Sequence, residues 1–117
     1  DVKVYADVLL KHAVPLGNQD LRLTAKATVE RNMADGMIIT GDITGEEASV
    51  DDLIKLKGEI DKPILVGSGI NKDNVSNYLK YCDGVIVGTS LKENNTTNNP
   101  VSRENVREFI KIVKNNF

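Results

Sequence analysis

The sequence has few aromatic residues, one cysteine, one histidine and no long apolar run. Phe, Tyr and Trp together make up 4% of the 117 residues, so a core built from this chain must be aliphatic. The single cysteine, Cys82, cannot form a disulfide within the chain, and this fits a reducing compartment. No run approaches the roughly 18 apolar residues that a membrane-spanning helix needs, and no secretory signal peptide is visible. We therefore expect a cytoplasmic protein without a transmembrane segment.

An excess of positive charge is also missing. The formal net charge is −2, and the isoelectric point is near 5.4. Proteins that bind nucleic acids usually carry a basic patch on a basic domain, so we expect no nucleic-acid partner. The length fits one domain, and the 40% of apolar residues is enough to build a core.

Apolar runs bounded by glycine, proline and asparagine predict four strands, each followed by a helix. The strands are expected at residues 3–10, 35–41, 62–69 and 83–90, and the helices at residues 20–34, 49–60, 70–81 and 102–117. Ser49, Asn71 and Ser102 are the expected N-caps of the last three helices. The stretch "KENNTTNNP", at residues 92–100, predicts a polar, solvated loop. Strands two to four are continuous apolar runs, which is typical of parallel strands covered by helices.

Two architectures accommodate four such units: an open doubly wound sheet, or part of a (β/α)8 TIM barrel. In doubly wound nucleotide-binding folds the glycine-rich loop follows the first strand, whereas here glycine-rich ends follow the third and fourth. Barrels often bind phosphate after strands seven and eight, which favours the C-terminal half of a TIM barrel. We therefore expect an α/β fold with a single (βα)4 half-barrel domain over residues 1–117. Such a half is either a fragment of a longer barrel or a homo-oligomer that pairs through its open edges.

The ends of the third and fourth strands carry the clearest candidate binding site. The sequences "VGSGI" and "VGTSL" each place glycine and a small hydroxyl residue where a strand ends. Glycine lets the backbone approach an anion, and successive N–H groups can then point at it. We expect these two loops to form one phosphate-binding cup from Gly67, Ser68, Gly69, Gly88, Thr89 and Ser90. The alternative is that the glycines only make tight turns.

The first two strands end in further candidates. By strand alternation Asp7 and Lys11 share a face, which would be the inner face of a barrel. The alternative for Asp7 is a barrel-filling ion pair, while Lys11 and His12 are the candidate acid/base or electrostatic residues. Asp7, Thr40 and Thr44 are expected to line the mouth. No spacing of acidic residues here requires a metal ion.

Four segments of the sequence resemble the BtpA family. They are "ADVLLKHAVPLG" (6–17), "ADGMIITGDITG" (34–45), "PILVGSGINKDNV" (63–75) and "DGVIVGTSLK" (83–92). The resemblance implies a TIM barrel about twice as long, of which this chain matches the C-terminal half. It also implies a role in photosystem I biogenesis with peripheral membrane association. The kinship of the family with phosphate-binding barrels supports the phosphate-binding cup. The resemblance identifies no substrate, no enzymatic activity and no cofactor.

Two functions are therefore expected. In the first, the protein binds or acts on a phosphorylated small molecule or inorganic phosphate, and Lys11 and His12 perform acid/base chemistry if it is an enzyme. In the second, it is a non-catalytic assembly factor that uses the barrel as a binding scaffold.

Overall fold

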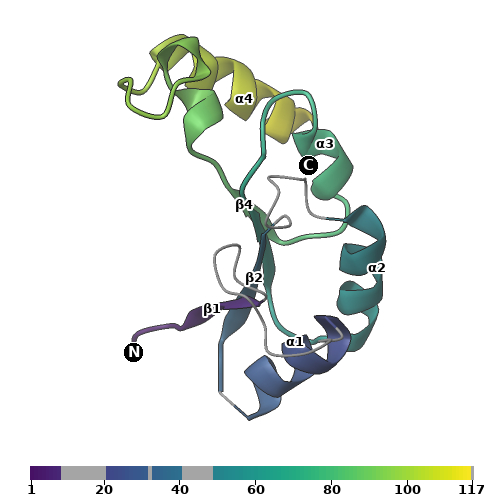
Figure 1. Ribbon diagram of the computed structural model, residues 1–117. Helices are drawn as coiled ribbons and strands as arrows, with labels where there is room; N and C mark the ends of the chain where they lie inside the picture. The colour runs from purple at the N-terminus through teal and green to yellow at the C-terminus, as the bar shows by residue number, and fades with distance from the viewer. Residues whose placement is uncertain (9–20, 32, 41–48, 117) are drawn as a thin grey trace.

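The computed structural model describes residues 1–8, 21–31, 33–40 and 49–116, and shows four parallel strands alternating with helices (Figure 1). The strands are β1 (Tyr5–Val8), β2 (Gly36–Thr40), β3 (Ile64–Gly67) and β4 (Gly84–Ile86). The helices are α1 (Leu21–Glu30), α2 (Val50–Glu59), α3 (Val75–Tyr78) and α4 (Arg103–Asn115). Two short 3-10 turns, η1 (Thr89–Leu91) and η2 (Glu93–Asn95), lie between β4 and α4. None of the described helices is long and apolar enough to cross a membrane.

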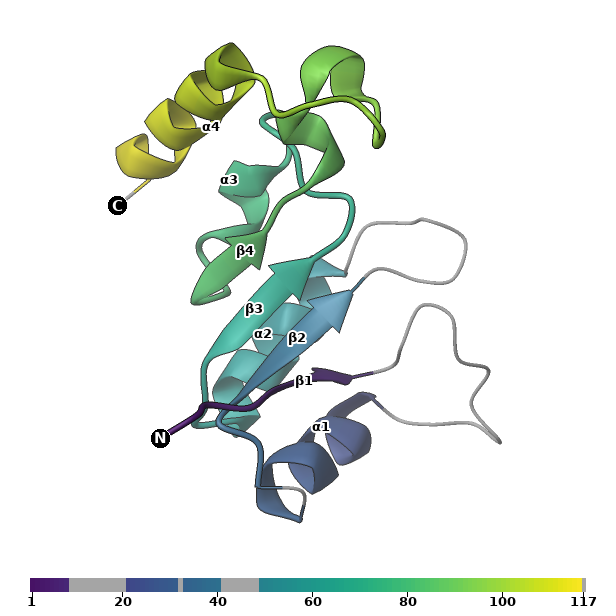
Figure 2. The same cartoon turned by 90° about the vertical axis from the view of Figure 1, so that its left-hand side faces the viewer.

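The strand order distinguishes between the two architectures. The four strands pair in the order β1-β2-β3-β4, and every pairing is parallel. Figures 1 and 2 show α1, α2 and α3 on the same face of this sheet, with α4 beyond β4. A doubly wound sheet would reverse its strand order and carry helices on both faces. The predicted α/β fold is confirmed, and its sequential strands and one-sided helices are consistent with half a TIM barrel.

The core lies between the sheet and these helices. Val8, Ile39 and Val66 are side by side in register and buried on the face that the helices cover. The neighbouring row, with Asp7 beside Ile38 and Ile38 beside Leu65, alternates to the opposite face and remains partly or fully exposed. The buried core is aliphatic apart from Tyr78 and Phe109, as the composition predicts.

The two Asp-Gly pairs of the sequence make the same contact in the structure. Asp35, just before β2, accepts a hydrogen bond from the backbone N–H of Val4 at 2.9 Å. Asp83, just before β4, accepts one from the N–H of Ile64 at the start of β3, also at 2.9 Å. Each aspartate therefore ties its own strand to the preceding one at the amino end of the sheet.

A lysine accompanies each of these aspartates. Lys3 lies 3.4 Å from Asp35, and Lys57 lies 2.7 Å from both carboxylate oxygens of Asp83. The hydrogen bond from Val4, assisted by Lys3, lowers the pKa of Asp35. Partial burial acts to raise the pKa of Asp83, but the bonds from Lys57 and Ile64 outweigh it, and that pKa is also lowered.

One local prediction was wrong. Ser49 and Ser102 do cap α2 and α4, since their hydroxyls accept the N–H of Asp52 and Asn105, but Asn71 does not cap α3. The helix begins later, at Val75, and the side chain of Asn71 instead accepts N–H groups of the turn before it. The stretch 92–100 is largely exposed, as predicted, and it contains η2 and pairs Lys92 with Val101.

Candidate functional site

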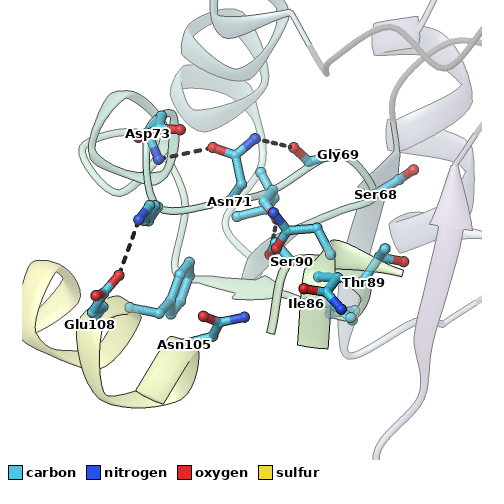
Figure 3. A pocket seen from close by; sticks show the side chains of 15 residues that line it. Ser68, Gly69, Asn71, Asp73, Ile86, Thr89, Ser90, Asn105 and Glu108 are labelled. Atoms are coloured by element: carbon cyan, nitrogen blue, oxygen red, sulfur yellow. Dashed lines mark hydrogen bonds and ion pairs between the residues drawn. The ribbon is translucent and has the colours of Figure 1, made fainter. Parts of the chain in front are cut away.

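A cavity of about 750 Å³ lies at the carboxyl ends of β3 and β4, where the two glycine loops meet α4 (Figure 3). The loop after β3 forms one wall, and the loop after β4 forms a second. Residues of η2 and α4 form the third. The lining residues are Ser68, Gly69, Ile70, Asn71, Lys72, Asp73, Ile86, Gly88, Thr89, Ser90, Asn94, Asn95, Asn105, Glu108 and Phe109.

The loop after β3 has an unusual backbone that its own asparagines hold in place. Ser68 and Gly69 are both left-handed, with φ of 66° and 71°. The carbonyl oxygen of Gly69 accepts the side-chain amide of Asn74 at 2.9 Å and that of Asn71 at 3.4 Å. The N–H of Asn71 in turn donates to the side-chain oxygen of Asn74 at 2.9 Å. Glycine adopts this backbone readily and serine does not, so the loop keeps a strained residue at the cavity wall.

The loop after β4 is fastened to the loop after β3. The hydroxyl of Ser90 donates to the carbonyl oxygen of Ile70 at 2.8 Å, and the hydroxyl of Thr89 lies 3.1 Å from that of Thr97. Ser90 therefore joins the two loops, and its hydroxyl proton already has an acceptor. Because η1 begins at Thr89, the N–H groups of its first turn have no acceptor within that turn.

The third wall is rich in side-chain amides. Asn94 and Asn95 are left-handed, with φ of 53° and 50°. Asn105, in the first turn of α4, donates its amide to the carbonyl oxygen of Lys92 at 2.9 Å and so fastens α4 to the end of η1. Phe109, in the same helix, lines the cavity and is buried in the core. Amides can both donate and accept hydrogen bonds, so this wall suits hydroxyl or phosphate oxygens.

One ion pair crosses the cavity between two of its walls. Lys72, which follows the glycine loop, lies 3.0 Å from Glu108 of α4. This contact joins the β3–α3 loop to α4, and a dashed line marks it at Glu108 in Figure 3. The hydrogen bond to Glu108 raises the pKa of Lys72.

The structure brings most of the predicted cup together. Ser68, Gly69, Gly88, Thr89 and Ser90 all line this cavity, while Gly67 is the last residue of β3 and pairs in register with Thr40. The hydroxyl of Thr40 is buried and has no hydrogen-bond partner among the described residues.

Asp7 is the only remaining predicted residue that the structure describes, and it does not line the cavity. It is exposed on the uncovered face of the sheet. Lys11, His12 and Thr44 lie outside the described residues. In the part of the chain that the structure describes, no three His, Cys, Asp or Glu residues are placed to hold a metal ion.

Sequence reasoning missed the third wall and the ion pair. Lys72 and Glu108 are 36 positions apart, and nothing local links them. The asparagine-rich stretch at residues 94–99 carried a usable signal, because asparagine tolerates the left-handed backbone better than most residues.

Comparison with known proteins gives one family and several relatives. Residues 1–115 match the sequence model of the BtpA family. An uncharacterized protein of Pyrococcus furiosus is 47% identical over 96% of the chain, and an uncharacterized mitochondrial protein of Caenorhabditis elegans is 31% identical over 97%. A photosystem I biogenesis protein, BtpA of Synechocystis, is 38% identical over 97% of the chain. The chain spans 42%, 41% and 40% of the lengths of these relatives, respectively. No solved structure matches.

Proposed function

The chain belongs to the BtpA family, and from that premise and the geometry of its cavity we propose that it binds a phosphorylated small molecule or inorganic phosphate between its two glycine loops. The observation that carries the proposal is that both loops, which follow successive strands, border one cavity with polar groups in its lining. Binding sites of α/β barrels lie at this end of the strands, often with phosphate between the last two βα loops.

The backbone supplies most of the binding groups in this proposal. Gly69 and Gly88 have no side chain between the backbone and the cavity, so their peptide groups can approach a phosphate oxygen closely. The first N–H groups of η1, at Thr89 and Ser90, are donors of the required kind. The hydroxyl of Ser90 contributes by holding the two loops together rather than by donating to the ligand.

Catalysis in this proposal rests on Lys11 and His12, which follow β1 in the sequence. If the protein is an enzyme, these two residues are the acid/base or electrostatic groups that act on the phosphorylated substrate. Turnover of a phosphate ester that disappears in Lys11→Ala and His12→Ala, with binding of inorganic phosphate retained, supports an enzyme.

The binding proposal is tested by placing a charge at Gly88. A side chain there would meet nothing within 4 Å, so Gly88→Asp adds a carboxylate to the cavity without a steric clash. Gly88→Asn is the neutral variant of the same shape, and Gly58→Asp, on the open surface of α2, is the control for an added surface charge. Melting temperature is followed during titration with inorganic phosphate and a panel of phosphate monoesters.

We expect phosphate to raise the melting temperature of the wild type and of Gly58→Asp, to raise that of Gly88→Asn less, and to leave that of Gly88→Asp unchanged. The proposal fails if no phosphate compound stabilises the wild type, or if Gly88→Asp responds as the wild type does.

A second function is supported by the name of the Synechocystis relative, which is a photosystem I biogenesis protein. In this alternative the chain is a non-catalytic assembly factor that associates with membranes peripherally and uses the barrel as a scaffold. Association with a membrane fraction that survives Lys11→Ala, His12→Ala and Gly88→Asp supports this alternative. Loss of that association in the same variants contradicts it.

The uncovered face of the sheet bears on the state of assembly. Tyr5 is 42% exposed, and Ile38 and Leu65 are only partly buried on this face. We propose that the 117-residue chain pairs with a second copy, so that two half barrels cover each other. Light scattering should then give about twice the mass of 12.8 kDa, and a stable monomer would contradict the pairing.

A further inference from the structure

Among the described residues, the charged side chains that line the cavity are more negative than positive, although the proposed ligand is an anion. Lys72 is the only Lys or Arg among the lining residues of the described chain, and Asp73 and Glu108 contribute two carboxylates. Glu108 holds the one ammonium group at 3.0 Å. Among the described residues, the one cation that a phosphate would meet in this cavity is therefore already paired with a carboxylate.

The contact between Lys72 and Glu108 is of a kind that opens readily. The side chains of Lys72 and Glu108 are 57% and 49% exposed, respectively, and water can replace either partner. Exposed ion pairs with a single contact contribute little to stability. A phosphate dianion offers more charge and more acceptor oxygens than a carboxylate, so it competes well for the same ammonium group.

The two partners are attached to different parts of the molecule. Lys72 follows Ile70 and Asn71, which the bonds from Ser90 and to Asn74 fix beside the glycine loops. Glu108 precedes Phe109, which anchors α4 in the core. Lys72 therefore stays beside the phosphate cup when its contact with Glu108 opens.

We propose that Lys72 is the cation that binds the ligand's phosphate and that Glu108 holds Lys72 until the ligand displaces it. This inference rests on the proposed function and adds two residues to the cup. It makes Glu108 a competitor of the ligand, so removing each partner should change phosphate affinity in opposite directions.

The test is a calorimetric titration of the 117-residue chain with inorganic phosphate at low ionic strength. We expect Lys72→Gln to weaken binding about tenfold, because a charge-assisted hydrogen bond to phosphate is lost. We expect Glu108→Gln to strengthen binding about two- to fivefold, because a competing negative charge is removed. Lys55→Gln and Glu104→Gln remove the same charges from outside the cavity and should bind as the wild type does.

The outcomes separate this inference from the proposed function. If the wild type does not bind phosphate, the proposed function fails and the role of Lys72 fails with it. If the wild type binds, Gly88→Asp abolishes binding and Lys72→Gln binds normally, only the role of Lys72 is overturned. If Lys72→Gln and Glu108→Gln weaken binding equally, the pair is a scaffold between the loop and α4, which overturns the competition between Glu108 and the ligand.

Discussion

The two ends of the sheet use polar residues in different ways. At the amino ends, Asp35 and Asp83 each accept an N–H from a neighbouring strand and pair with a lysine, so each polar group has a partner within the fold. At the carboxyl ends, left-handed residues and side-chain amides surround an open cavity. The polar groups at the amino ends hold neighbouring strands together, whereas those at the carboxyl ends line a cavity.

Backbone strain also differs between the amino and carboxyl ends of the sheet. Four described residues other than glycine have a left-handed backbone, and three of them, Ser68, Asn94 and Asn95, line the cavity. The fourth, Met33, lies in the turn before β2. Residues with a strained backbone persist only where the surrounding structure holds them, and they cluster at functional sites. The comparison therefore predicts large stability effects at the amino end and mainly binding effects at the carboxyl end.

The largest effect is expected at Gly36, at the amino end of β2. A methyl group there would lie 2.4 Å from Cε1 of Tyr5 and 3.0 Å from the carbonyl oxygen of Pro63. Tyr5 can swing away, but the Pro63 oxygen accepts the N–H of Met37 and cannot. We expect Gly36→Ala to destabilise the fold by about 1–3 kcal/mol in urea unfolding.

Gly67, at the carboxyl end of β3, is the matched control. A methyl group there would make only ordinary contacts, the shortest 3.5 Å to Ile38. Gly67→Ala should change stability by no more than about 1 kcal/mol in either direction. If Gly67→Ala were as costly as Gly36→Ala, the proposed difference between the two ends would be wrong.

The second effect is expected at Asp83. Asp83→Ala removes the ion pair with Lys57 and leaves the N–H of Ile64 without its acceptor. Because the Asp83 side chain is 41% exposed, water weakens these contacts, and we expect the free energy of unfolding to fall by only about 1 kcal/mol. Asp83→Asn keeps an acceptor for Ile64 and should cost less.

The same aspartate predicts a pH dependence. The pKa of Asp83 is lowered in the folded chain, so its contribution to stability is complete above the ordinary carboxyl pKa of about 4 and is lost as the pH falls further. Urea unfolding at pH 7 and pH 3 should therefore show a smaller loss of stability for Asp83→Ala than for the wild type. An equal loss in both would mean that the pKa of this carboxylate does not change on folding.

The sequence predicted the elements better than the contacts between them. Apolar runs bounded by glycine predicted where β2 and β4 lie, and the glycine that begins β2 also allows the close approach between Gly36 and Tyr5. That Asp83 would accept the N–H of Ile64 could not be predicted, since the contact depends on the pairing of two strands. The wall formed by α4 was missed for the same reason, because only the folded chain brings Glu108 to Lys72.

An effect on stability no larger than that at Asp83 is expected at Asn95, in the third wall of the cavity. Its φ of 50° is costly for alanine and free of cost for glycine, so Asn95→Ala should destabilise the fold by about 1 kcal/mol and Asn95→Gly by less. Phosphate titrations of the same two variants then test the amide, which both variants lack. If Asn95→Gly keeps stability and loses phosphate affinity, this wall serves binding rather than folding.

The smallest effect on stability is expected from the Lys72–Glu108 pair, which is the most direct test of the comparison. Lys57 contacts both oxygens of Asp83 at 2.7 Å at the amino end, while Lys72 makes a single contact at 3.0 Å beside the cavity. Lys57→Gln should lower the urea midpoint measurably, and Lys72→Gln should leave it close to that of the wild type. Added salt should reduce the difference between the two variants, because it screens exposed charges. If both substitutions lowered the urea midpoint equally, the ion pairs at both ends would stabilise the fold. The proposed difference between the two ends would then be wrong.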